Sequence, residues 1–352
     1  MTANPLPIFD GHNDTLLRLY RKGLPVSAFF ERGQEGHIDL PRARQGGFAG
    51  GLFACFVPSD TPDTDLPAPD RGGYSVPFPG TPAAERALAV TNALAARLQR
   101  LERGSSGQVT ICRSASDIRT SLAAGSLAAV LHIEGAEAID PEMEALEVLH
   151  AAGLRSLGPV WSRPNIWGHG VPFRFPSSPD TGPGLTEAGK SLVRACNELR
   201  IMLDLSHLNE AGFWDVVALS DAPLVATHSN AHALCPCSRN LTDRQLDAIR
   251  ASGGVVGLNL AVSFLRPDGR NDADTPLEIL CDHVDHLVTR LGIEGVALGS
   301  DFDGCTVPAA IGDAAGLPNL IEALRARGYD EPALRRFAHE NWLAVLERTW
   351  GG

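Results

Sequence analysis

The chain is marked by short apolar runs that are almost unbroken, rather than by strict alternation of apolar and polar positions. Such runs are typical of parallel strands that are buried on both faces. They predict strands at residues 7–13, 49–56, 128–134, 154–160, 201–206, 223–228, 254–260 and 295–300. Helical periodicity fills most of the gaps and predicts helices at residues 83–102, 141–153, 185–200, 241–254 and 276–292. The helix at 141–153 is expected to begin with Asp140 as its N-cap and Pro141 as its first residue.

The order of these elements defines the expected fold. Strands that alternate with helices predict a parallel sheet with right-handed crossovers. Eight strands in a chain of 352 residues favour an α/β protein built as a closed (β/α)8 TIM barrel over one with an open sheet. No GxGxxG motif follows the first strand, which weakens a dinucleotide-binding alternative.

Two long segments interrupt the alternation of strands and helices. Residues 57–82 and 161–184 are rich in Pro, Asp and Gly, and each follows a predicted strand. In a β/α barrel the loops that follow strands form the catalytic face, and loops of this length are usually functional or disordered. No linker and no internal repeat divides the chain, so we expect a single barrel domain over residues 1–352 that carries both loops.

Composition narrows the class of protein further. Hydrophobic residues make up 44% of the chain and charged residues 20%, which argues against disorder. The net charge of -12, with arginines spread along the chain, disfavours a nucleic-acid or membrane partner. The seven cysteines form no CxxC pair, which is typical of free thiols in a reducing compartment. With no signal peptide and no apolar stretch of 18 residues, we expect a cytoplasmic protein.

Five side chains of the kinds that bind metals stand where predicted strands end. They are His12 and Asp14 in IFDGHND, Glu134 in AAVLHIEG, His207 in IMLDLSH and His228 in PLVATHS. The first two are two residues apart and project to one face of their strand. A buried glutamate is costly unless it is paired or bound to a metal. Each residue alone has an ordinary explanation, such as a turn or an ion pair, but the five together predict a site for two divalent ions.

The same side chains indicate which metal ions bind and which residue bridges them. Zinc is the usual ion of His and carboxylate sites that keep open positions, although these donors do not exclude Mn or Co. Some two-metal barrels bridge their ions with a carboxylated lysine, but Lys22 and Lys190 are the only lysines and neither ends a predicted strand. Glu134 is therefore the expected bridge and takes part in catalysis. We expect a barrel of the metal-dependent hydrolase type with two Zn²⁺ ions per subunit.

Further polar residues are candidates for the catalytic face. Asp301 and Asp303 end the eighth predicted strand in GVALGSDFDG, and Asp301 is assigned the proton transfer from water to the leaving amine. Arg239 in CSRNLTD is the candidate that clamps a substrate carboxylate. His169, in the second long loop, is the candidate that polarises a carbonyl. An ordinary surface position for Arg239 and a solvated loop position for His169 are the alternatives.

Together these motifs resemble the membrane (renal) dipeptidase family of zinc metallopeptidases, family M19. The resemblance covers almost the whole chain, in the segments DGHND, HIDLPRARQGGFAGG, IEGAEAI, LDLSH, THSNAHALC, SRN, LGSDFDG and ENWLAVLERTW. It implies a (β/α)8 barrel with two zinc ions. It also implies that His12 and Asp14 bind one ion, that His207 and His228 bind the other, and that Glu134 bridges them.

The resemblance also implies a reaction. Arg239 matches the arginine that holds the C-terminal carboxylate of the substrate, and Asp301 matches the acid of the eighth strand. The implied activity is hydrolysis of small dipeptides, including those with a C-terminal D-residue, by a hydroxide that bridges the ions. A homodimer is implied as well. Two alternatives stay open, namely another amide, lactam or ester hydrolase with this site, and a metal-binding relative without catalysis.

One segment departs from the family pattern. After the fourth strand the renal-type enzymes carry a Thr-His pair whose His contacts the substrate near the scissile group, whereas this chain reads LGPVWSRPN. Trp161 falls near the position of that His and is itself a candidate substrate contact. We expect His169, or Arg163, to reach the site from the longer loop in its place.

Overall fold

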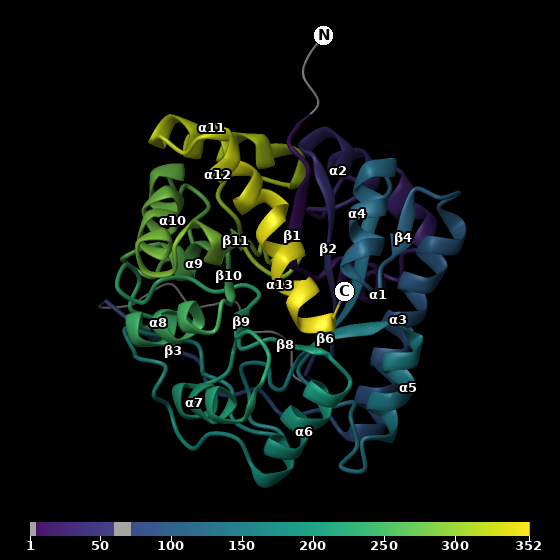
Figure 1. The fold of residues 1–352 in the computed structure, drawn as a ribbon, viewed down its shortest axis with the longest axis vertical. Coiled ribbons are helices and arrows are strands. Elements are labelled where there is room, and N and C mark those ends of the chain that lie inside the picture. Colours follow the sequence, from purple (N-terminus) through teal and green to yellow (C-terminus); the bar gives the residue numbers. More distant parts are fainter. Residues whose placement is uncertain (1–4, 60–71, 352) are drawn as a thin grey trace.

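The computed structural model describes residues 5–59 and 72–351 and shows strands at the centre with helices around them (Figure 1). Eight parallel strands form the centre. They are β1 (Ile8–Asn13), β2 (Phe48–Phe56), β5 (Leu127–Glu134), β6 (Leu154–Gly158), β8 (Met202–Leu203), β9 (Val225–Ala226), β10 (Val255–Leu258) and β11 (Val296–Leu298). Each predicted strand overlaps one of these, and the predicted barrel class is confirmed.

The strands close into a ring at two seams. Hydrogen bonds order β1, β2, β5, β6 and β8 in one sheet and β9, β10 and β11 in another. At the first seam Asp204 bridges Val225, and at the second Asn13 bridges Phe302, both in the parallel sense. Because both seams lie beside strand ends, closure of the ring brings the residues that follow β1, β8, β9 and β11 together.

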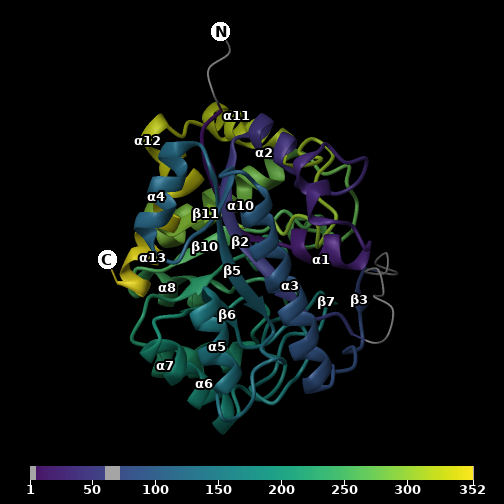
Figure 2. The ribbon, with the colours of Figure 1, turned by 90° about the vertical axis from the view of Figure 1, so that its right-hand side faces the viewer.

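Helices surround the ring on its outside and at its two ends. They are α1 (Thr15–Arg21), α2 (Leu40–Gly46), α3 (Ala84–Gly104), α4 (Ala115–Ala124), α5 (Glu144–Ala152), α6 (Glu187–Glu198), α7 (Glu210–Leu219), α8 (Asp243–Ala251), α9 (Val262–Leu265), α10 (Leu277–Leu291), α11 (Leu317–Arg327), α12 (Glu331–Arg335) and α13 (Asn341–Trp350). Figure 2 shows α3 and α4 over the outer side of β2 and β5. No helix of the described residues is long and apolar enough to cross a membrane.

Local capping explains where several helices begin. Thr186 accepts a hydrogen bond from the Gly189 N–H at the start of α6, and Thr242 forms a capping box with Gln245 at the start of α8. The predicted start of α5 was wrong. Residues 141–142 form a turn, the helix begins at Glu144, and the Asp140 carboxylate accepts from backbone N–H groups of that first turn.

The amino end of the barrel is filled with apolar side chains. Phe9, Val130 and Val255 point into this layer, and Trp342 and Leu346 of α13 pack against it. The Trp342 indole also donates to the Leu298 carbonyl at 2.9 Å. Figure 1 shows α13 lying across the strands at this end. The five predicted ligands lie at the opposite end, where the strands finish.

The two long loops meet in a small ribbon that the sequence did not indicate. β3 (Tyr74–Ser75) pairs with β7 (Arg174–Phe175) in the antiparallel sense. The Val76 N–H extends this pairing to the Phe173 carbonyl at 2.8 Å. Residues 60–71 of the first loop lie outside the described residues. The ribbon places both loops above the carboxyl ends of the strands, where a cavity forms.

Candidate metal centre and substrate cavity

The five predicted ligands converge at the carboxyl ends of four strands. His12 and Asp14 come from the end of β1, and Glu134 is the last residue of β5. His207 and His228 follow β8 and β9. All five side chains are buried. Side chains that lie far apart in the sequence therefore share one small volume.

Glu134 lies between the other ligands. Its Oε1 is 2.9 Å from His207 Nε2 and 3.4 Å from His228 Nε2. Its Oε2 is 3.6 Å from His12 Nε2, which is itself 3.5 Å from Asp14 Oδ2. One carboxylate oxygen thus faces each group of ligands, which is the arrangement that a bridging carboxylate requires.

The donor atoms fit divalent cations. His207 Nε2 and His228 Nε2 are 3.1 Å apart, so two nitrogen lone pairs of neutral rings face the same point. Within the described part of the chain, both ring nitrogens of His12 and Oδ1 of Asp14 are buried without a hydrogen-bond partner. Buried polar atoms of this kind normally have partners. Metal ions would give these atoms partners, and imidazole and carboxylate are ligand types that zinc prefers.

Burial shifts the protonation of the ligands. It lowers the pKa of His207 and His228 well below the usual range and raises the pKa of Glu134 well above it. Burial also lowers the pKa of His12, but the charges of Glu134 and Asp14 outweigh it and bring that pKa to about 10. The site thus concentrates several carboxylates in a low-dielectric volume. Positive charge from metal ions relieves that repulsion.

Hydroxyl groups orient two of the imidazoles. Ser162 Oγ lies 2.8 Å from His207 Nδ1. Thr227 Oγ1 donates to Asp204 Oδ2 at 2.6 Å and lies 2.7 Å from His228 Nδ1. Since the threonine proton goes to the carboxylate, the hydroxyl accepts from Nδ1–H. Nε2 of His228 then keeps its lone pair on the side of Glu134.

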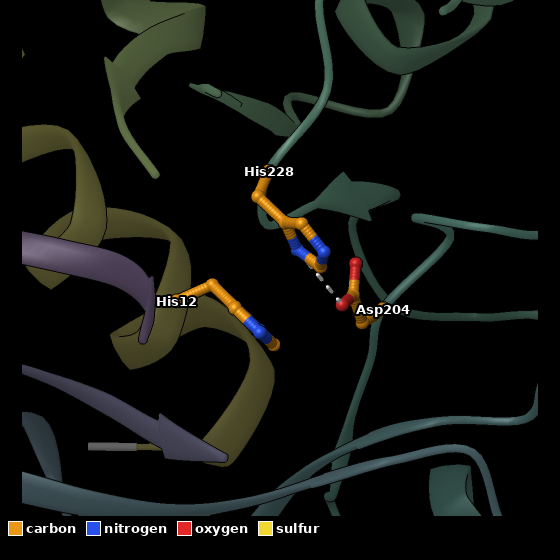
Figure 3. A group of neighbouring side chains, drawn as sticks. All are labelled: His12, Asp204 and His228. Carbon is orange, nitrogen blue, oxygen red and sulfur yellow. Dashed lines mark ion pairs between the residues drawn. The ribbon is translucent and has the colours of Figure 1, made fainter. Parts of the chain in front are cut away.

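Asp204 is a residue of the site that the sequence interpretation missed. Its Oδ2 lies 3.8 Å from His228 Nδ1 and 3.7 Å from His132 Nε2. Figure 3 shows its carboxylate beside the His228 ring, with His12 nearby. The available signal was an aspartate inside the apolar run IMLDLSH, because a buried carboxylate needs partners. Together with His12 and His228 it forms a further group of closely spaced donor atoms.

The two acids after β11 differ in their partners. Asp301 is partly buried beside the ligands, and Asn259 Nδ2 donates to its Oδ2 at 2.9 Å. Burial raises the pKa of this carboxyl. Asp303 instead accepts from Arg18 Nε at 2.9 Å and from the His37 N–H at 2.6 Å. Asp301 thus lies beside the metal-type side chains, whereas Asp303 anchors the loop.

Arg239 is buried close to the ligands. Its Nη1 donates to Ser229 Oγ and its Nη2 to the His228 carbonyl, both at 2.9 Å. Its Nε has no hydrogen-bond partner among the described residues. Burial lowers the pKa of this arginine, whereas Asp301 and Glu134 raise it. A buried guanidinium with a spare donor suits a carboxylate partner.

The residues around Trp161 take different positions. Trp161 lines the cavity. Arg163 is held below it by Glu137 Oε1 and the Val57 carbonyl, each at 2.8 Å. His169 has its Nδ1 3.4 Å from the Gly184 carbonyl and is not among the described residues that line the cavity. The structure thus brings Trp161 to the cavity, whereas Arg163, His169 and Arg239 are not among the described residues that line it.

A cavity of about 600 Å³ opens above the ligands. Asp14, Glu134, His207 and Asp301 line its floor. The volume is in the range of small-molecule sites and far exceeds what the metal ions need. The geometry therefore combines a polar, metal-binding floor with room for a small organic substrate.

A parallel β/α barrel with His and carboxylate side chains gathered at its strand ends defines a metal-dependent hydrolase. The chain belongs to the membrane dipeptidase family, Peptidase family M19, which its residues 2–350 match. The resemblance inferred from the motifs is thus confirmed, and the protein is a metallopeptidase of the dipeptidase type.

Individual relatives agree with this assignment. A protein of Klebsiella pneumoniae, described by its place in the pqqA 5′ region, is 53% identical over 253 residues, which are 72% of this chain and 93% of that one. The crystal structure of a dipeptidase of family M19 matches with a TM-score of 0.94 at 55% identity, over 99% of both chains. A metallopeptidase of Rhodobacter sphaeroides, liganded with a phosphinate mimic of L-Ala-D-Ala, matches with a TM-score of 0.94 at 54% identity, over 99% of this chain and 100% of the other.

Proposed function

We propose that the chain hydrolyses dipeptides with two zinc ions, one held by His12 and Asp14 and the other by His207 and His228. Glu134 bridges them. The observation that carries the proposal is the position of this carboxylate, with one oxygen toward each group of ligands. The imidazoles of His207 and His228, whose pKa burial lowers, are ready to coordinate through Nε2, because metal ligands must be deprotonated.

The protein supplies the proton chemistry. When bound, two zinc ions provide Lewis acidity at the carbonyl and lower the pKa of water toward about 7. Asp301 takes the proton from the attacking water and passes it to the leaving amine. Asn259 engages Oδ2 of this carboxylate, which assigns the transfer to Oδ1. Burial raises the pKa of Asp301, so its carboxylate is a stronger proton acceptor.

Arg239 sets the length of the substrate. We assign its guanidinium to the C-terminal carboxylate of the dipeptide, a charged pair that gains strength in a buried site. Longer peptides carry that carboxylate farther from the scissile bond and lose the contact. The mimic of L-Ala-D-Ala on the Rhodobacter sphaeroides relative supports the inclusion of L-Xaa-D-Xaa dipeptides among the substrates.

Replacement of Arg239 by alanine tests this assignment. Loss of a hydrogen bond to a charged group predicts that kcat/KM for Ala-Ala falls about tenfold or more. Zinc content stays unchanged, and the dipeptide amide, which lacks the carboxylate, loses far less. An equal loss for both compounds would show that Arg239 acts elsewhere.

A substrate panel tests the reaction class. Zinc-loaded protein is compared with chelated protein on L-L and L-D dipeptides, a β-lactam and an ester. We expect zinc-dependent turnover of dipeptides, with the other compounds slower. Turnover confined to the lactam or ester would favour the alternative hydrolase, and none at all would favour a silent relative. A single domain, a homodimer and a cytoplasmic location stay predictions.

A further inference from the structure

An unbroken row of aromatic rings forms one side of the cavity. The ring centroids of Phe56 and Trp161 are 4.9 Å apart, those of Trp161 and Phe173 are 5.5 Å apart, and those of Phe173 and Phe264 are 5.8 Å apart. All four residues line the cavity. They come from β2, the loop after β6 and α9, and we call them the aromatic wall. Spacings of this size are those of rings in contact.

The aromatic wall stands directly beside the metal ligands. The ring centroid of His207 is 5.7 Å from that of Trp161 and 6.4 Å from that of Phe173. Asp14 and Asp301 approach the same cavity from the ends of β1 and β11. A substrate on the metal floor therefore has an acidic side and an apolar side.

The wall is held in place from behind. The Arg163 guanidinium carbon lies 5.3 Å from the ring centroids of both Phe56 and Trp161. Its nitrogens bind Glu137 and the Val57 carbonyl, so this cation is fixed and satisfied. The β3–β7 ribbon holds the backbone of Phe173. Such support keeps the rings in place without occupying the cavity.

The order of rings along the wall gives the substrate a direction. The Arg239 guanidinium carbon is 5.9 Å from the Phe264 ring, so the C-terminal carboxylate belongs at that end. The scissile carbonyl lies over Glu134 and His207, beside Trp161. The residue on the N-terminal side of the scissile bond then meets Trp161 and Phe56.

We propose that the aromatic wall binds the side chain of the N-terminal residue, so that the preferred substrates are dipeptides with a large apolar residue at that position. This specificity rests on the proposed dipeptidase function and on the assigned role of Arg239. A leucine or phenylalanine side chain removes ring surface from water. A polar side chain of equal size loses its hydrogen bonds to water when it packs against the rings, because the ring faces offer no equivalent partner.

The first experiment uses matched dipeptides on the zinc-loaded protein. Leu-Ala, Asn-Ala and Ala-Ala separate polarity from size, because leucine and asparagine are similar in shape. We expect kcat/KM for Leu-Ala to exceed both others at least about tenfold. The reversed set, Ala-Leu and Ala-Asn, should show a smaller preference. A preference confined to the reversed set, or no preference, would overturn the proposal.

The second experiment removes the central ring. Trp161→Ala should lower kcat/KM for Leu-Ala about tenfold while Ala-Ala changes less than about threefold. Trp161→Phe should keep most of the preference. Trp214→Ala is the matched control, since this tryptophan stacks on Arg244 and is not among the cavity-lining residues.

The results of these experiments distinguish failure of the proposed specificity from failure of the proposed dipeptidase function. Zinc content is measured for every variant, because Trp161 contacts a ligand and its loss must not be confused with loss of metal. If no dipeptide is hydrolysed by the zinc-loaded protein, the proposed function fails. If dipeptides are hydrolysed but Trp161→Ala lowers Leu-Ala and Ala-Ala equally at full zinc content, the specificity fails and the dipeptidase function stands.

Discussion

The two halves of the barrel hold their polar side chains in different ways. The long-strand half, β1, β2, β5 and β6, has strands of five to nine residues, whereas the short-strand half, β8 to β11, has strands of two to four. In the short-strand half, hydrogen bonds from side chains take the place of some backbone hydrogen bonds between strands. Asp204 Oδ1 accepts from the N–H groups of Ser206 and Thr227, at 2.9 Å and 2.8 Å.

This difference matches the roles of the ligands. Glu134 ends a strand that pairs continuously with β2, so its position follows from the regular sheet. His207 and Asp301 have φ values of 67° and 59°, in the left-handed region that is unusual outside glycine. Such residues concentrate at functional sites. Glu134, the proposed bridge, is thus held by the regular sheet, whereas His207 and Asp301 are turned toward it by loops that depend on side chains.

The largest expected effect is at Glu134, whose two carboxylate oxygens face different groups of ligands. Glu134→Gln keeps the shape but removes the charge shared by both groups of ligands. Loss of an outer partner weakens metal sites 10–100-fold, so loss of the bridge should lower zinc affinity and kcat/KM at least about a thousandfold. Equilibrium dialysis and dipeptide assays measure both. Glu137→Gln changes a buried glutamate paired with Arg163 and should keep zinc. A fully loaded, active Glu134→Gln protein would contradict the bridge.

The next prediction compares how much one buried polar side chain in each half contributes to the free energy of unfolding. Asp204→Ala leaves the N–H groups of Ser206 and Thr227 and the Thr227 hydroxyl without their acceptor. At about 1–3 kcal/mol for each unsatisfied buried group, the metal-free protein should lose at least about 3 kcal/mol. Ser156→Ala in the long-strand half removes a single bond to His132 and should cost about 1 kcal/mol. Urea unfolding measures both, and equal losses would remove the distinction between the halves.

A pH effect is expected in the short-strand half. Burial lowers the pKa of His283 to about 4, and its ring joins the Ala231 N–H to the Leu265 carbonyl. Because the unfolded chain takes up this proton near pH 6.5, stability is full above that pH and falls until about pH 4. The loss from this group reaches about 2 kcal/mol at pH 5. His283→Gln should show a smaller decrease between pH 7 and 5, and an unchanged decrease would assign it to other groups.

Local features of the sequence predicted most of the fold. Apolar runs marked every barrel strand, because this signal acts within a few residues. The ligands were recognised because a charged or imidazole side chain at the end of an apolar run is conspicuous. Each of these predictions needed a short segment only.

Features that depend on distant partners could not be predicted. Asp204 acts through Thr227, and β3 pairs with β7 across about a hundred residues. A strand of two residues is too short to show the periodicity from which strands are predicted. The position of Trp161 was recognised, but its ring neighbours Phe56 and His207 come from two other segments. His169 was expected at the site because of its loop, yet the path of that loop turns it toward Gly184.

The smallest effect concerns the hydroxyls that orient the imidazoles. Thr227→Val keeps the shape but removes the acceptor of His228 Nδ1–H, so zinc affinity should fall about tenfold. Thr227→Ser should restore it. Ser162→Ala removes the partner of His207 and should cost less, because the hydroxyl of Ser162, unlike that of Thr227, is not itself bonded to a buried carboxylate. Chelator competition measures affinity, and the ¹⁵N shifts of the rings report the tautomer without catalysis. A larger loss of zinc affinity for Ser162→Ala than for Thr227→Val would contradict this order. It would show that the loop after β6, rather than the short-strand half, has the greater effect on the orientation of the imidazoles.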